Sequence, residues 1–185
     1  MAEKVCPFWV GYLLSSPVRK LWHNPEKILE PYIKQGMRVV DIGCAMGFFS
    51  LPLAKLVGLN GKVVCVDIQK KMIRSLEKRA KKADLLERIE TRVCSESSFC
   101  LDNLGGEIDF ALAFAVVHEI LEPLVLFSQV YKALKSEGKL LMAEPKGRVS
   151  EKDFTISVQI AKGHSFEIVD RPHIWGTRVA LLQKQ

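Results

Sequence analysis

The sequence lacks a hydrophobic run long enough to cross a membrane. The apolar run near its N-terminus covers residues 8–14, well short of the roughly 20 residues that a membrane-spanning helix needs. Glu3 and Lys4 give this run no net positive flank, and no small-residue cleavage pattern follows it. We therefore expect neither a targeting segment nor a membrane span.

The sequence also lacks paired cysteines. Its five cysteines include no C-x-x-C spacing, and the odd count predicts free thiols in a reducing, cytoplasmic compartment. The histidines are dispersed along the chain, and no cysteine–histidine spacing fits zinc. We therefore predict no metal site.

Internal repeats and low-complexity tracts are absent as well. The 185 residues suit one well-buried domain, and 48% hydrophobic with 26% charged residues is typical of globular proteins. The net charge of +6 permits attraction to nucleic acid or anionic lipid without demonstrating either. We expect an N-terminal arm or lid over residues 1–23 and a single domain over residues 24–185.

Strand-like and helix-like segments alternate along that domain. Strands are expected at 38–42, 62–67, 89–93, 108–114, 139–144, 166–172 and 177–183. Helices are expected at 25–34, 48–57, 69–83, from 123 and from 151. No helix separates the last two strands, so they should pair antiparallel. The pattern predicts an α/β fold, a doubly wound and mostly parallel seven-stranded sheet with a C-terminal antiparallel hairpin and helices on both faces.

The most informative stretch is Asp41-Ile42-Gly43-Cys44-Ala45-Met46-Gly47, at the end of the first expected strand. Its two glycines suit a tight turn that lets the backbone approach a ligand. Asp67 ends the next strand, where a carboxylate can accept hydrogen bonds from ribose hydroxyls. The two features together predict a nucleoside-binding βαβ unit.

The glycine spacing differs from the dinucleotide fingerprint, because Phe48 stands where that fingerprint has its third glycine. Asp41 would repel a pyrophosphate and suits a positively charged ligand. The stretch resembles the first motif of class I (Rossmann-like) S-adenosylmethionine-dependent methyltransferases, with Ala45 in place of the middle glycine. The resemblance implies a methyltransferase that uses S-adenosylmethionine and releases S-adenosylhomocysteine.

Ligands of open parallel sheets bind beyond the carboxyl ends of the strands. Together with the resemblance, this implies a cofactor site of residues that follow four strands, namely Asp41, Gly43, Ala45, Gly47, Phe48, Asp67, Ile68, Ser95, Glu96 and Phe114. Ile68 would pack on the adenine face, and Ser95 and Glu96 would flank its amine. An alternative for Ser95 and Glu96 is a helix N-cap followed by a first-turn acid.

His118 and Glu119 form the one adjacent histidine–carboxylate pair at this edge of the sheet. A histidine there could remove a proton from the nucleophile that accepts the methyl group. The alternative is that both residues only begin the helix after the fourth strand. We list them as candidate catalytic residues.

The expected function is in-line methyl transfer to an unidentified nucleophile. A small-molecule acceptor is favoured over nucleic acid, because Ala113-Phe114-Ala115-Val116 replaces the Asn/Asp-Pro-Pro-Tyr signature of amino-methylating nucleic-acid enzymes. The basic face of residues 69–83 keeps nucleic acid open, although such runs are usually solvated. Rival hypotheses are a non-catalytic nucleoside-binding regulatory module and a nicotinamide-dependent oxidoreductase. The sequence leaves the oligomeric state open.

Overall fold

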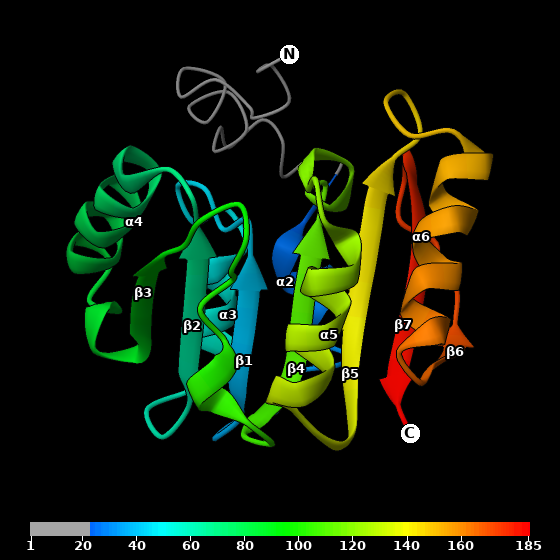
Figure 1. Ribbon diagram of the computed structural model, residues 1–185. Helices are drawn as coiled ribbons and strands as arrows, with labels where there is room; N and C mark the ends of the chain where they lie inside the picture. The colour runs from blue at the N-terminus through cyan, green and yellow to red at the C-terminus, as the bar shows by residue number, and fades with distance from the viewer. Residues whose placement is uncertain (1–22) are drawn as a thin grey trace.

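The computed structural model describes residues 23–185. Its core is one seven-stranded sheet in the order β3-β2-β1-β4-β5-β7-β6 (Figure 1). The strands are β1 Arg38–Ile42, β2 Lys62–Asp67, β3 Ile89–Val93, β4 Ile108–Phe114, β5 Leu134–Pro145, β6 Phe166–Asp170 and β7 Thr177–Lys184. Strands β1 to β5 pair in parallel, whereas β7 pairs antiparallel with both β5 and β6. The predicted fold class is confirmed.

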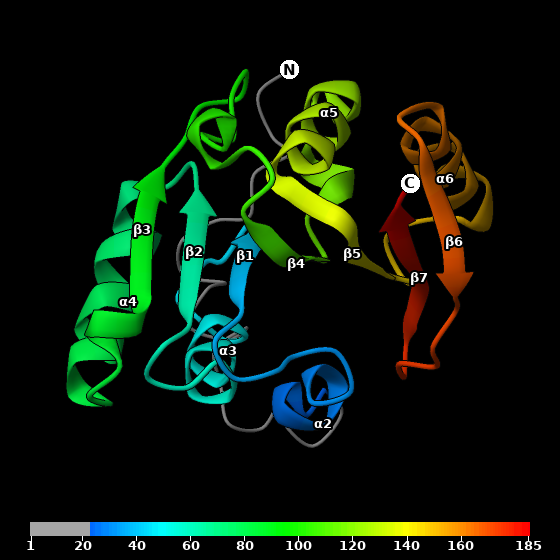
Figure 2. The same ribbon diagram turned by 90° about the horizontal axis from the view of Figure 1, so that it is seen from below.

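Helices cover both faces of the sheet. The α-helices are α2 Pro25–Leu29, α3 Ser50–Leu56, α4 Lys70–Lys82, α5 Pro123–Ala133 and α6 Glu151–Gly163. Short 3-10 turns are η2 Leu86–Arg88, η3 Asp102–Leu104 and η4 Val117–Glu119. Seen from below, α5 and α6 lie on one side of the sheet and α2 and α3 on the other, with α4 beside β2 and β3 (Figure 2).

Two hydrophobic clusters correspond to these two faces. Alternate residues of a strand point to opposite faces, so Val40 joins the cluster under α5 and α6 while Val39 joins the cluster under α2, α3 and α4. Both side chains are fully buried. This double coverage explains why the central strands are continuous apolar runs rather than alternating ones.

Capping residues set the helix starts that the sequence predicts. The side chain of Asn24 accepts hydrogen bonds from the backbone N–H groups of Glu26 and Lys27, ahead of Pro25 in the first turn of α2. Ser150 caps α6 by accepting from the N–H of Asp153 at 3.1 Å. The local sequence therefore determines where these helices begin.

Several element boundaries differ from the expectation, three of them as follows. Helix α2 ends at Leu29 rather than near residue 34, because Pro31 has no N–H to continue the helical ladder. Strand β5 begins at Leu134 rather than at residue 139, directly after the last residue of α5, Ala133. Strand β6 ends at Asp170 rather than at residue 172, since Pro172 cannot donate to a sheet.

Some expectations fall outside the described residues. The predicted N-terminal arm or lid over residues 1–23 lies outside them except for His23. Within residues 23–185, no helix is long and apolar enough to span a membrane. No group of three or more histidine, cysteine, aspartate or glutamate residues in this range is placed to hold a metal ion.

Candidate active site at the carboxyl ends of the strands

The order of the strands reverses at β1. Strands β2 and β3 lie on one side of β1, and β4 and β5 lie on its other side. The carboxyl ends of these strands point to the same edge, at the top of Figure 1. The crevice outside such a switch point is where open α/β sheets bind ligands. The residues that follow β1, β2 and β4 therefore define the candidate site.

A tight turn over residues 43–47 follows β1. The backbone φ angles of Gly43, Ala45 and Gly47 are +68°, +46° and +84°, all in the left-handed region. Ala45 thus adopts the conformation that a glycine would take at this position, at a cost of roughly 1 kcal/mol. The N–H groups of Gly43 and Cys44 donate to the carbonyl of Val66, which fixes the turn to the end of β2.

The two glycines are required by packing within the protein itself. A Cβ atom on Gly43 would lie 2.4 Å from Cγ2 of Val116, and one on Gly47 would lie 2.3 Å from Cδ1 of Leu76. The sequence interpretation was that the missing side chains leave room for a ligand. The structure gives a different reason, because the loop after β4 and helix α4 occupy that room.

Asp67 joins the turn to the start of α4. Its Oδ2 accepts a hydrogen bond from the N–H of Ala45 at 3.0 Å, and its Oδ1 accepts one from the N–H of Gln69 at 2.8 Å. Burial raises the pKa of Asp67, while these two hydrogen bonds lower it in part. Each carboxylate oxygen has a second lone pair, so Asp67 can accept further hydrogen bonds from a ligand.

Asp41 is a second buried carboxyl group beneath the turn. It is 3% exposed, and its Oδ2 accepts a hydrogen bond from Oγ of Ser50 at 2.5 Å. Its pKa is raised to about 7, chiefly by burial and also by the nearby charge of Asp67, while the hydrogen bond from Ser50 lowers it in part. An acid that ionises near neutral pH in a cleft is a marker of a functional site, and its anion suits a cationic ligand.

This pKa predicts a specific dependence of stability on pH. Between about pH 4 and pH 7 the folded protein holds a proton on Asp41 that the unfolded chain has lost. The Asp41 contribution to the free energy of unfolding therefore falls as pH rises through this range, by up to a few kcal/mol. Asp41→Asn stays neutral and should lose this part of the slope.

Urea unfolding of the wild type and of Asp41→Asn at several pH values from 5 to 8 tests the prediction. The exposed Asp102 supplies the control variant Asp102→Asn. Equal slopes in the wild type and Asp41→Asn would show that Asp41 titrates normally in the folded protein.

The two predicted aromatic residues lie in the core on the α2–α3 face. The ring of Phe114 is 4.4 Å from that of Phe49 and 5.3 Å from that of His23, and Phe48 packs edge-on against Phe49 at 5.1 Å. Phe48 and Phe114 are 7% and 8% exposed. Both rings support the end of the sheet, and their contact with a cofactor stays a prediction.

Ile68 follows Asp67 and is half-buried, whereas Ser95 and Glu96 are exposed in the loop after β3. The backbone of Ser95 pairs with that of Ser98 in an isolated antiparallel bridge. No helix begins at Ser95, so the helix N-cap alternative is wrong. The loop instead closes on itself, with Ser95 and Glu96 accessible beyond the end of β3.

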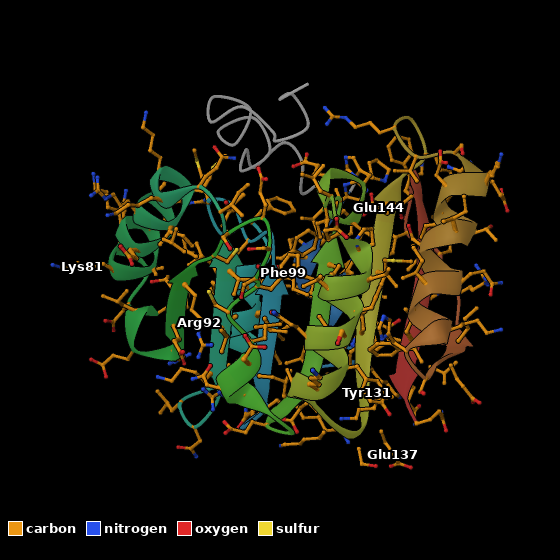
Figure 3. All side chains as sticks on the ribbon, viewed as in Figure 1. Lys81, Arg92, Phe99, Tyr131, Glu137 and Glu144 are labelled. Atoms are coloured by element: carbon orange, nitrogen blue, oxygen red, sulfur yellow. The ribbon has the colours of Figure 1, made fainter. Side chains whose placement is uncertain are left out.

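His118 lies in η4, directly after β4, and contacts a residue that the sequence interpretation missed. Its Nδ1 is 2.5 Å from Oε2 of Glu144, near the end of β5 (Figure 3). Oε1 of Glu144 accepts hydrogen bonds from the N–H groups of Val116 and Val117, at 3.2 and 2.8 Å. Glu119 is farther away, with its Oε1 3.8 Å from Nε2 of His118.

The sequence held a signal for Glu144. It ends the apolar run Leu140-Leu141-Met142-Ala143, so a carboxylate was to be expected at the same edge as Asp41 and Asp67. The predicted site included residues at the ends of the first four strands only, so Glu144 at the end of the fifth was missed. The structure brings together the turn, Asp67, the loop after β4 and His118, while Ser95 and Glu96 lie at the periphery.

Comparison with known proteins agrees with this geometry. Residues 33–179 match the model of a family described as a methyltransferase domain. The structure superimposes on a SAM dependent methyltransferase from Aquifex aeolicus with a TM-score of 0.86 and 22% sequence identity, over 98% of this chain and 100% of that one.

Curated relatives match over shorter stretches. A ribosomal protein L11 methyltransferase of Thermosipho melanesiensis is 30% identical over 116 residues, which is 63% of this chain and 41% of that protein. A 23S rRNA (uracil(1939)-C(5))-methyltransferase of Acinetobacter baumannii is 42% identical over 55 residues, which is 30% of this chain and 12% of that protein. The matches thus span less than half the length of these relatives.

Proposed function

The chain belongs to the methyltransferase domain family, and from this premise we propose that it transfers the methyl group of S-adenosylmethionine to a nucleophilic atom of an acceptor. The observation that carries the proposal is the joining of three strand ends into one site. Asp67 accepts from Ala45 in the turn after β1, and Val116 in the loop after β4 packs on Gly43. The turn at residues 43–47, the carboxyl group of Asp67 beside it and the loop after β4 that carries His118 are therefore in contact with one another, which supports the proposal.

The residues present fit S-adenosylmethionine, which carries a positive sulfonium and a positive amine. Two carboxyl groups, Asp41 and Asp67, lie buried at this edge, and neither forms an ion pair with a lysine or arginine among residues 23–185. A buried acidic pair without a cation favours a cationic ligand. Asp67 would bind the ribose hydroxyls, and the turn at residues 43–47 would bind the methionine part.

The remaining candidate residues would surround the adenine. Ile68 would pack against its face, and Ser95 and Glu96 would hydrogen-bond its amine, with Phe48 and Phe114 supporting the floor of the site. Bound S-adenosylmethionine supplies a methyl group that its sulfonium charge already activates. The protein then has to align the acceptor and exclude water. His118 would remove the proton of the acceptor, with Glu119 beside it.

For the acceptor, we propose a small molecule, since the segment after β4 lacks the Asn/Asp-Pro-Pro-Tyr signature of amino-methylating nucleic-acid enzymes. RNA is the second candidate, and one observation favours it. Helix α4 holds seven of the chain's 27 lysines and arginines and one of its 21 acidic residues, so the rest of the chain carries 20 of each. The net positive charge of +6 is thus equal to the net charge of this helix alone. Lys81 projects from its outer side (Figure 3). The 23S rRNA named for the Acinetobacter baumannii relative points the same way, whereas the other relative above is named for a ribosomal protein.

Calorimetry and turnover test the proposal together. We expect S-adenosylmethionine to bind the wild-type chain and NADH not to bind. Tight NADH binding without S-adenosylmethionine binding would favour the oxidoreductase hypothesis instead. Incubation with a small-molecule fraction and with ribosomal RNA from the same cells, with S-adenosylhomocysteine as the readout, then separates the acceptors. A chain that binds S-adenosylmethionine and yields no product with either fraction would fit the non-catalytic binding module.

A further inference from the structure

The carboxylate of Glu144 is buried at the carboxyl end of β5. Its residue is 1% exposed, and no lysine or arginine within residues 23–185 forms an ion pair with it. Its cross-strand neighbour Arg178 instead donates to the carbonyl of Val149, at 2.8 Å. A buried carboxylate needs hydrogen-bond donors in place of water, and here all of the observed donors come from the loop after β4.

The pattern of these donors determines the role of each oxygen. Oε1 accepts two backbone N–H groups, from Val116 and Val117. When the carboxyl group is ionised, Oε2 can only accept, and Nδ1 of His118 at 2.5 Å then donates to it. In a neutral imidazole with its proton on Nδ1, Nε2 carries the lone pair.

That lone pair is not used within the described part of the protein. Nε2 of His118 is buried and has no hydrogen-bond partner there. Oε1 of Glu119 is 3.8 Å away, too far for a hydrogen bond. The ring is therefore fixed from one side by Glu144, and its basic nitrogen stays available.

We propose that Glu144 is the positioning residue of His118, which holds the ring with its proton on Nδ1 and thereby makes Nε2 the proton acceptor of the reaction. This inference rests on the proposed function. The proton of the nucleophile X–H passes to Nε2 as X takes up the methyl group. The bond between this methyl group and sulfur breaks, its electron pair stays on sulfur, and S-adenosylhomocysteine leaves. The imidazolium that forms stays paired with the Glu144 carboxylate. The proton then leaves to solvent, so the catalyst is regenerated. Glu144 acts through His118 in the manner of the carboxylate in a serine protease triad, which orients a histidine without taking its proton.

Nitrogen-15 NMR of the wild-type chain labelled at histidine tests the proposal without any acceptor. At about pH 8, where an ordinary histidine is neutral, we expect the His118 signal to show a protonated Nδ1 and an unprotonated Nε2. His118→Gln assigns the signal by its loss. A proton on Nε2 of His118, in the other tautomer or in a cation, would overturn the proposal, and this measurement needs no variant of Glu144.

Glu144→Gln provides a sharper test. The amide oxygen can still accept from Val116 and Val117, which turns the amide NH₂ toward Nδ1 of His118. Nδ1 must then accept, so the proton should move to Nε2 and the tautomer should invert. The conservative variant Glu144→Asp should keep the wild-type tautomer. The control Glu137→Gln removes a carboxylate at the opposite end of the same strand (Figure 3) and should change nothing.

The affinity for S-adenosylmethionine separates failure of this inference from failure of the proposed function. We expect Glu144→Gln to bind it within twofold of the wild type, because the observed hydrogen bonds of the Glu144 side chain go to Val116, Val117 and His118, and none goes to Asp67 or to the turn at residues 43–47. An unchanged tautomer in a folded Glu144→Gln would show that Glu144 is purely structural. If the wild-type chain does not bind S-adenosylmethionine, this result would refute the proposed function alone.

Discussion

Asp67→Ala should weaken the binding of S-adenosylmethionine by ten- to hundredfold, on the basis of roughly 1.5–3 kcal/mol for a charge-assisted hydrogen bond. The carboxylate would accept from the ribose hydroxyls through lone pairs that its two backbone partners leave unused. Its removal also frees the N–H groups of Ala45 and Gln69, so the turn itself should loosen. Both effects weaken the binding of the same ligand, so this is the largest effect on binding that we expect from the removal of one side chain.

Calorimetry with S-adenosylmethionine measures the loss directly. Thermal melting establishes that the variant is folded, and Asp102→Ala, on the exposed turn η3, controls for the lost charge. The affinity of Asp67→Asn for S-adenosylmethionine should lie between those of the wild type and Asp67→Ala, because its one amide oxygen can replace only one of the two backbone contacts. An Asp67→Ala protein that is folded and binds with wild-type affinity would remove Asp67 from the site.

Gly43→Val should destabilise the fold by ~4 kcal/mol or more, since strained backbone and an overpacked contact each cost about 1–3 kcal/mol and valine adds a branched Cβ. The φ angle of Gly43 is +68°, and its new Cβ would lie 2.4 Å from Cγ2 of Val116. The clash separates the turn after β1 from the loop after β4. We therefore expect loss of S-adenosylmethionine binding as well, through displacement of both loops rather than through a blocked ligand.

Gly105 offers a matched control, because a Cβ there meets no atom within 4 Å and its φ is not positive. Gly105→Val should melt within a few degrees of the wild type. A second comparison isolates the contact: Val116→Ala should recover part of the stability that Gly43→Ala loses. If Gly43→Val is as stable as Gly105→Val in urea unfolding, the packing between the two loops is not what this position requires.

The first four strands could be predicted from sequence because each is a short run of residues that favour strands, between turn signals. Such residues are β-branched in β1 to β3 and mainly apolar in β4. Residues 38–42, 62–67, 89–93 and 108–114 match β1 to β4 without a shift. The start of β5 could not be predicted, since Leu134 fits the inner face of a continuing helix as well as the first position of a strand. The spacing of nearby apolar residues does not distinguish the helix from the strand. The pairing of Leu134 with Ile108 on β4 makes it a strand residue.

The positions of the candidate site residues in the fold could be predicted only in part, and their roles stay predictions. The turn at residues 43–47 and the position of Asp67 at a strand end could be predicted because each depends on a short stretch of neighbouring residues. The reason for the glycines could not, since Val116 and Leu76 are distant in sequence and only the fold brings them to the turn. Glu144 shows the same limit, because its partner His118 lies 26 residues earlier and the pair exists only through the pairing of β4 with β5.

The hydrogen bonds from two backbone N–H groups to Glu144 also affect how readily the loop after β4 unfolds locally. Amide protons in a surface loop usually exchange with solvent through small local fluctuations. The protons of Val116 and Val117 are instead held by a side chain of β5, a strand paired on both sides with β4 and β7. Their release requires Glu144 to withdraw or β5 to detach from its neighbours. The loop that carries His118 should thus belong to the same cooperative unfolding unit as the middle of the sheet, and the backbone that places the proton acceptor should be as slow to open as the core.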